Sequence, residues 1–107
     1  MAKISTVNYE LIGFDDGSTI TYFHNPDCCE YNYADFEQLD DIARKTDFDT
    51  NNMVFESVKG AGFRFGNENK MFFVPCYSEQ NGYYSDDIEI YYNGEKVLHF
   101  DCEQKFF

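Results

Sequence analysis

Short runs of hydrophobic and β-branched residues, interrupted by polar turn residues, recur along most of the chain. Such residues favour the pleated surface of a strand, so several segments are predicted to be strands: 5–14, 18–24, 53–59, 62–66, 70–77, 86–92 and 96–103. Asp15, Asp16 and Gly17 form a turn signal between the first two, which are therefore predicted to pair as a hairpin.

One segment departs from this pattern and is predicted to be a helix. Its apolar residues follow helical spacing: Phe36, Leu39, Ile42 and Ala43. Asp35 is a suitable N-cap, and Gln38 follows three residues later as in a capping box. The sequence therefore predicts a single α+β domain over residues 1–107, with an antiparallel β-sheet of about five to seven strands and one main α-helix at about 35–45.

The last two predicted strands allow an argument about their register. A two-residue turn at Asn93 and Gly94 would place charged residues opposite apolar ones. A three-residue loop ending at Gly94 sets Ile88 opposite Leu98 instead, and it keeps the apolar side chains on one face. We prefer this second register, which also points His99 outward beside Asp87. The inward residues are then Ile88, Ile90, Leu98, Phe100 and Cys102.

Acidic residues greatly outnumber basic ones. Twenty Asp and Glu against eight Lys and Arg give a net charge of −12, and no Lys or Arg lies between Lys3 and Arg44. Repulsion disfavours nucleic acids and anionic membranes as direct partners, whereas a basic protein partner is favoured. The alternative is a surface that only keeps the protein soluble. The candidate partner-binding residues are Asp15, Asp16, Glu37, Asp40 and Asp41, with Tyr83 and Tyr84 from a predicted turn.

Neither a membrane span nor a secretory signal is predicted. No apolar run is long enough to cross a bilayer, and the N-terminal segment lacks the apolar core of a signal peptide. We therefore expect a monomeric protein of a reducing cytoplasm, in which the four cysteines stay free or bind a metal.

Residues 24–30 concentrate metal-binding chemistry just after a predicted strand. The three candidate ligands are His24, Cys28 and Cys29, because one imidazole and two thiols across a turn suit zinc. The fourth ligand is left open among Asp27, Glu30 and Cys102, with Cys76 and His99 as further remote candidates. The alternative is that the two cysteines are small buried apolar residues and that His24 lies on the surface.

No catalytic residue is predicted. The chain contains no H-E-x-x-H or G-x-S-x-G motif and no phosphate-binding glycine loop followed by a helix. Glu30 could act as the base of a small metal-dependent hydrolase, but no other residue supports such an enzyme. We expect a protein that is not an enzyme.

Three of these segments together resemble a family of small domains encoded by bacteriophages and prophages. They are the H-x3-CCE element at 24–30, the acidic segment 35–42, and the NGYYS element at 81–85. The resemblance runs from about Thr19 to Tyr92. The chain departs from the family at Cys76, where a tryptophan is expected, so Cys76 is an insecure ligand candidate.

Within this family the chain is similar to the zinc-containing anti-CRISPR proteins that inhibit type II-A Cas9. The resemblance implies binding to Cas9 in the bacterial cytoplasm, at its recognition lobe, so that target DNA is not loaded. It does not identify the contact residues, and the acidic surface is our physical hypothesis for them. The alternatives are an acidic phage protein that binds another basic host protein, and the small metal-dependent hydrolase.

Overall fold

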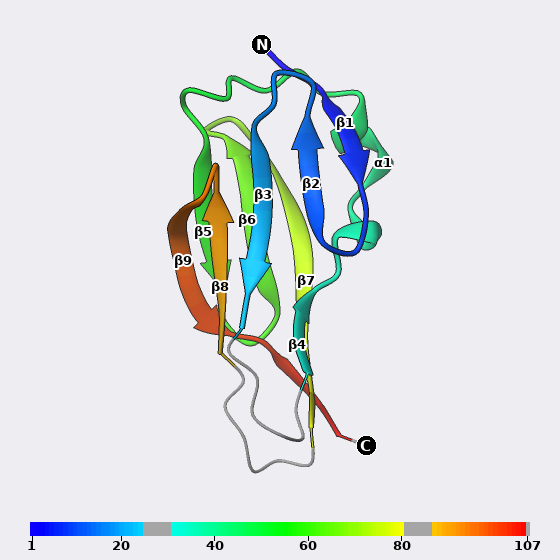
Figure 1. The fold of residues 1–107 in the computed structure, drawn as a ribbon, viewed down its shortest axis with the longest axis vertical. Helices are drawn as coiled ribbons and strands as arrows, with labels where there is room; N and C mark the ends of the chain where they lie inside the picture. Colours follow the sequence, from blue (N-terminus) through cyan, green and yellow to red (C-terminus); the bar gives the residue numbers. More distant parts are fainter. Residues whose placement is uncertain (25–30, 81–86, 107) are drawn as a thin grey trace.

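The structure is a computed structural model that describes residues 1–24, 31–80 and 87–106. The described residues form two five-stranded sheets that pack face to face as a sandwich (Figure 1). The first sheet is antiparallel throughout. Its order is β1 (Ile4–Val7), β2 (Leu11–Phe14), β3 (Thr19–Phe23), β8 (Asp87–Tyr92) and β9 (Glu95–Asp101).

The second sheet is organised around one long strand, β7 (Lys70–Gln80). The first half of β7 pairs with β6 (Gly62–Asn67), which pairs in turn with β5 (Val54–Val58). The second half pairs antiparallel with β4 (Tyr31–Ala34) and parallel with β10 (Glu103–Phe106). The chain therefore crosses from the first sheet to the second between β9 and β10, at Cys102.

The core between the sheets is built mainly from aromatic and branched side chains. The first sheet contributes fully buried isoleucines and the second contributes phenylalanines: Ile12, Ile20, Ile88, Ile90, Phe63 and Phe65. Phe63 lies 6.3 Å from Phe100 of the first sheet, and Phe55 lies 5.2 Å from Tyr92, both between ring centroids. These contacts across the layers show why so many aromatic residues fit in so small a chain.

The predicted α+β class is wrong, because the main helix at 35–45 does not form. The segment contains one 3-10 turn, η1 (Phe36–Gln38), and one turn of α-helix, α1 (Asp41–Arg44). All other regular structure in the described part of the chain is β-strand. The domain is therefore mostly β.

Backbone conformation at two residues explains why the helix breaks. Leu39 (φ −59°, ψ 137°) and Asp40 (φ −57°, ψ 134°) are extended. The Asp40 carboxylate accepts a hydrogen bond from the Ile42 amide at 2.9 Å, so it caps a new turn instead of continuing the old one. Leu39 is buried but Ile42 is 56% exposed, so the apolar spacing does not reflect one continuous buried helix face.

The predicted hairpin between the first two strands is confirmed, with Ile12 opposite Ile20. The predicted strand 5–14, however, is two strands, β1 and β2. Asn8 separates them because its side-chain oxygen accepts hydrogen bonds from the amides of Glu10 (2.8 Å) and Leu11 (3.0 Å) and so forms a turn. Strand β4 was not predicted.

The predicted three-residue loop between β8 and β9 is also wrong. Asn93 (φ 52°) and Gly94 (φ 84°) form a two-residue turn that sets Tyr92 opposite Glu95. A bulge between β8 and β9 then shifts the register, so that Ile90 faces Leu98 and Ile88 faces Phe100. The predicted apolar face is nevertheless correct. The short turn alone would place charged residues opposite apolar ones, and the bulge returns the apolar side chains of β8 and β9 to the same face.

Candidate functional site

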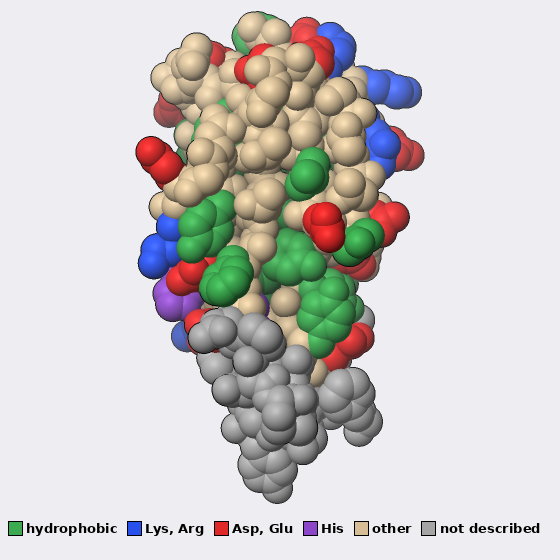
Figure 2. All heavy atoms as spheres, in the orientation of Figure 1, with side chains coloured by type: hydrophobic (Ala, Val, Ile, Leu, Met, Phe, Trp, Pro, Cys, Tyr) green, Lys and Arg blue, Asp and Glu red, His purple; other side chains and the backbone are tan. Residues whose placement is uncertain are grey.

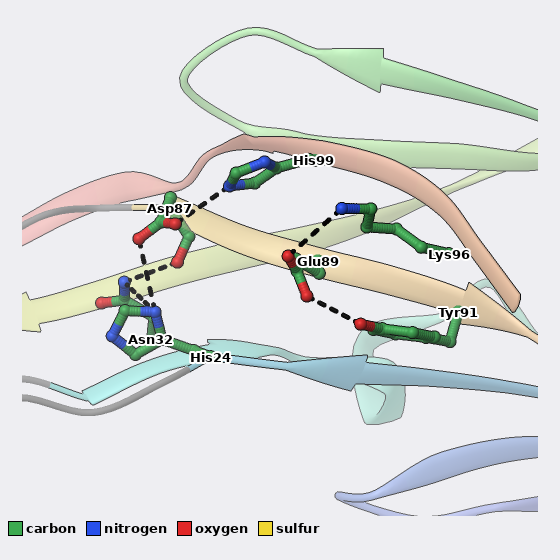
Figure 3. Close-up of polar contacts among 7 residues, drawn as sticks. All are labelled: His24, Asn32, Asp87, Glu89, Tyr91, Lys96 and His99. Carbon is green, nitrogen blue, oxygen red and sulfur yellow. Dashed lines mark hydrogen bonds and ion pairs between the residues drawn. The ribbon is translucent and has the colours of Figure 1, made fainter. Parts of the chain in front are cut away.

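A cluster of polar residues joins the two sheets near one end of the sandwich. Four of its members are drawn in Figure 3, and they come from different elements: His24 follows β3, Asn32 lies in β4, Asp87 begins β8, and His99 lies in β9. Ser78 of β7 completes the cluster. Asn32 and Ser78 are among the buried polar residues, 2% and 0% exposed, so their polar atoms need partners inside the protein.

Asn32 is the centre of this cluster. Its side-chain nitrogen donates to the backbone oxygen of Asp87 at 2.8 Å and lies 3.3 Å from His24 Nδ1. Its side-chain oxygen accepts a hydrogen bond from the Ser78 hydroxyl. Asn32 and Ser78 are direct partners in the β4–β7 ladder, so strand pairing itself brings them together on the inner face.

Asp87 lies between the two histidines of the chain. Its Oδ2 is 2.9 Å from His99 Nε2, and its Oδ1 is 3.5 Å from His24 Nδ1 (Figure 3). The prediction that His99 points outward beside Asp87 is therefore confirmed. The His24 side chain is only 7% exposed and that of His99 is 50% exposed, so one carboxylate orients a buried and a surface imidazole.

A second polar group continues along the outer face of β8. Glu89 accepts a hydrogen bond from the Tyr91 hydroxyl at 2.7 Å and lies 3.6 Å from Lys96 Nζ. The Tyr91 hydrogen bond, with the charge of Lys96, lowers the pKa of Glu89. The same contact raises the pKa of Tyr91. Glu89 therefore stays charged beside the neutral phenol of Tyr91. Figure 3 shows the contacts of Glu89 with Tyr91 and Lys96.

Only part of the predicted zinc site falls within the described chain. Cys28, Cys29, Asp27 and Glu30 lie outside the described residues, as do Tyr83 and Tyr84. Among residues 1–24, 31–80 and 87–106, no three His, Cys, Asp or Glu side chains form a group that could hold a metal ion. The Nδ1 atom of His24 lies 3.5 Å from Asp87 Oδ1 and 3.3 Å from the side-chain nitrogen of Asn32, so this candidate ligand belongs to the polar cluster.

The two remote cysteine candidates have a different environment. Cys76 and Cys102 are both buried free thiols. A hydrogen bond with Cys102, together with burial, raises the pKa of Cys76. Zinc binds thiolates, so this environment disfavours Cys76 as a ligand. It also gives Cys102 a partner other than a metal.

The predicted partner-binding acids of the described chain are all exposed. Asp15 and Asp16 lie in the β2–β3 turn, Glu37 lies in η1, Asp40 caps α1, and Asp41 begins it. Figure 1 shows the β2–β3 turn at one end of the first sheet and α1 beside β1. Thr50 donates a hydrogen bond to Asp16 at 2.6 Å, which is the main cause of its lowered pKa. We call these five carboxylates the acidic edge, although Lys3, which contacts Asp15, and Arg44 of α1 lie among them.

Tyrosines form a row that sequence reasoning did not identify. Tyr31, Tyr33 and Tyr77 lie on β4 and β7, with ring centroids 4.8 Å apart for the first two and 5.8 Å for the last two.

In Figure 2, which shows the outer face of the first sheet, hydrophobic and tyrosine side chains gather over the lower half. Carboxylates lie among them, whereas the visible Lys and Arg side chains lie at the edges of the view.

A hollow of about 770 Å³ lies at the other end, lined by Met1 and by residues from the segments 46–54 and 67–70. Two of its acidic residues, Asp47 and Asp49, already bind other side chains. Asp47 forms an ion pair with Lys3, and Asp49 accepts a hydrogen bond from the Asn52 side chain at 2.7 Å. The hollow therefore offers fewer available carboxylates than its composition suggests.

Comparison with known proteins gives one match. A family model described as a domain of unknown function, DUF7448, matches residues 1–90. No curated protein and no solved structure matches the chain. Among the helices of the described residues, none has the length and apolar character that crossing a membrane requires.

Proposed function

Because this chain belongs to the DUF7448 family, whose description assigns no function, we propose a role from two other sources: its charge and the resemblance of its sequence elements to zinc-containing anti-CRISPR proteins. The charge suggests an inhibitory binding protein for a basic protein partner. The resemblance makes that partner a type II-A Cas9, bound at its recognition lobe so that target DNA is not loaded. Cas9 proteins hold their nucleic acids in a positively charged channel, which suits an acidic competitor.

The excess of exposed carboxylate carries this proposal. Three of the basic side chains are already in ion pairs with acids: Lys3 with Asp47, Arg64 with Glu56, and Lys96 with Glu89. Acidic side chains remain in excess after these pairs are formed, as the net charge of −12 requires. The exposed ones include the five of the acidic edge. Complementary potential speeds the encounter with a basic surface and disfavours nucleic acid as the direct partner.

A DNA cleavage assay tests the proposed inhibition. Cas9 and guide RNA are mixed with the protein before target DNA is added, and cleavage is expected to stop near equimolar protein. Adding the protein after the DNA should inhibit much less, because the proposed step is loading. Complete cleavage at large molar excess, whichever is added first, contradicts the proposal. Capture of a different basic protein from host lysate would then identify the alternative partner.

We also propose that zinc, bound by His24, Cys28 and Cys29, stabilises the fold without taking part in a reaction. The position of His24 at the polar cluster supports this, because a metal there would fix the segment that follows β3. Elemental analysis of purified protein should give near-stoichiometric zinc, and a chelator should lower the Tm. The Cys28→Ser variant should lose both the zinc and the chelator effect. Metal-free protein whose Tm ignores the chelator contradicts the zinc proposal.

A further inference from the structure

The row of tyrosines lies on the outer face of β4 and β7. Side chains alternate along these strands, so Asn32, Ala34, Cys76 and Ser78 point into the protein and are buried. Tyr33 and Tyr77 are direct partners on the opposite face and are half-buried, and Tyr31 is 52% exposed. Strand pairing therefore presents three adjacent phenol rings on one surface.

Carboxylates lie directly beside these rings. The Tyr33 hydroxyl is 3.5 Å from Glu79 Oε1. The Gln38 side chain donates to Asp35 at 2.6 Å and lies 3.4 Å from the Tyr77 hydroxyl. Burial, and then the charges of Glu79 and Asp35, raise the pKa of Tyr33 to about 12. The Tyr33 phenol therefore remains neutral beside two carboxylates, so ring faces and negative potential coincide on this surface.

We infer that this tyrosine–carboxylate surface, made of Tyr31, Tyr33, Tyr77, Asp35 and Glu79, binds arginine side chains of the basic partner. A guanidinium group stacks on aromatic rings and also pairs with carboxylates, whereas a lysine ammonium is a compact charge that gains less from the rings. The inference rests on the proposed function, because it assigns the contact chemistry of the same basic partner.

Charge argues against a second copy of the chain as the occupant of this surface. Each copy carries a net charge of −12, so two such faces would repel each other at close range. Arginine-rich protein surface supplies the opposite charge and the planar groups that the rings accommodate. An arginine-rich surface is therefore complementary to the tyrosine–carboxylate surface both in charge and in its planar groups.

Oligoarginine and oligolysine peptides of equal length test the inference without Cas9. The chain has nine tyrosines and no tryptophan, so tyrosine fluorescence, to which Tyr31, Tyr33 and Tyr77 contribute, can follow binding, and the variants below locate it. We expect oligoarginine to bind about threefold to tenfold more tightly at the same salt concentration, in keeping with stacking of a partly desolvated guanidinium. Equal affinity for the two peptides overturns the inference, because charge alone would then explain the attraction.

Single variants locate the contact on the protein. Tyr31→Leu should reduce the preference for arginine to near unity, while Tyr31→Phe should retain it because the ring remains. Tyr9→Leu is the matched control, since Tyr9 is 64% exposed in the β1–β2 connection, outside this surface. Thermal unfolding of each variant verifies folding. An unchanged preference in folded Tyr31→Leu protein, or an equal loss in Tyr9→Leu, overturns the assignment.

The same variants separate this inference from the proposed function. If the wild-type protein inhibits Cas9 but folded Tyr31→Leu protein inhibits equally well and keeps the arginine preference, the inhibitor role stands and the surface assignment fails. If the wild-type protein leaves Cas9 active but prefers oligoarginine through Tyr31, the surface assignment stands and Cas9 is the wrong partner.

Discussion

At the scale of single residues, Asn32 shows how much depends on one buried amide. It contacts the backbone of Asp87 and the side chains of His24 and Ser78, and so it connects the two sheets. Such groups contribute modestly when satisfied but are costly when a partner is lost. The polar cluster is therefore a structural junction, whatever role the neighbouring segments have.

Replacing Asn32 by alanine should destabilise the protein by about 2–4 kcal/mol, because the buried Ser78 hydroxyl and the backbone oxygen of half-buried Asp87 each lose a hydrogen bond. Urea unfolding followed by circular dichroism measures the change. Asn51→Ala is the matched control, since Asn51 is exposed, and it should change stability by less than about 0.5 kcal/mol. An Asn32→Ala protein as stable as the control would show that the junction contributes nothing.

The sequence does not reveal this junction because its members are far apart in the chain. Asn32 and Ser78 become neighbours only when β4 pairs with β7. A polar residue at the inward position of a Tyr-Asn-Tyr segment would have been a signal, but it has meaning only once that segment is known to be a strand. The contact of His99 with Asp87 was predictable because both lie in one local hairpin.

At the scale of elements, a hairpin marked by one short turn was predicted correctly. Segments in which two local structures compete, such as a helix and a cap, were predicted wrongly. The β2–β3 hairpin follows from one short turn and is confirmed. The predicted helix failed because Asp40 favours capping over helix continuation, and apolar spacing cannot distinguish one helix from two separate turns. The three-residue β8–β9 loop was predicted wrongly because a bulge inside the ladder shifts the register after a two-residue turn. The sequence contains no signal for this bulge.

Strand β7 shows why the sandwich itself was not foreseen. It changes partners along its length, from β6 in its first half to β4 and β10 in its second. The parallel pairing with β10 needs the chain to pass from one sheet to the other at Cys102. Such long-range exchange depends on the whole core, and alternation of side chains along one strand carries no information about it.

At the scale of the whole molecule, net charge is the property that sequence predicts most directly and that structure refines. The total of −12 follows from composition. The structure adds the arrangement: the acidic edge adjoins the tyrosine–carboxylate surface of β4 and β7 at η1, where Asp35 and Glu37 lie. Long-range attraction and close contact are thereby assigned to two adjoining groups of side chains.

This division predicts how salt should act on binding to Cas9. The Debye length is about 10 Å at 0.1 M salt and about 3 Å at 1 M, so steering by exposed carboxylates weakens steeply over this range. The association rate should fall at least tenfold between about 0.05 and 0.5 M salt, while the dissociation rate changes less. Surface plasmon resonance separates the two rates. An association rate that does not depend on salt contradicts the electrostatic mechanism.

Paired charge variants then test whether the acidic edge matters more than total charge. Glu37→Gln with Asp41→Asn removes two charges from this edge, whereas Glu68→Gln with Glu95→Gln removes two exposed charges from the β6–β7 turn and the start of β9. Both pairs change the net charge equally, from −12 to about −10, so a uniform field predicts equal slowing of association. Because potential decays over the Debye length, charges that face the partner act most strongly. We therefore expect the first pair to slow association more and to flatten its salt dependence.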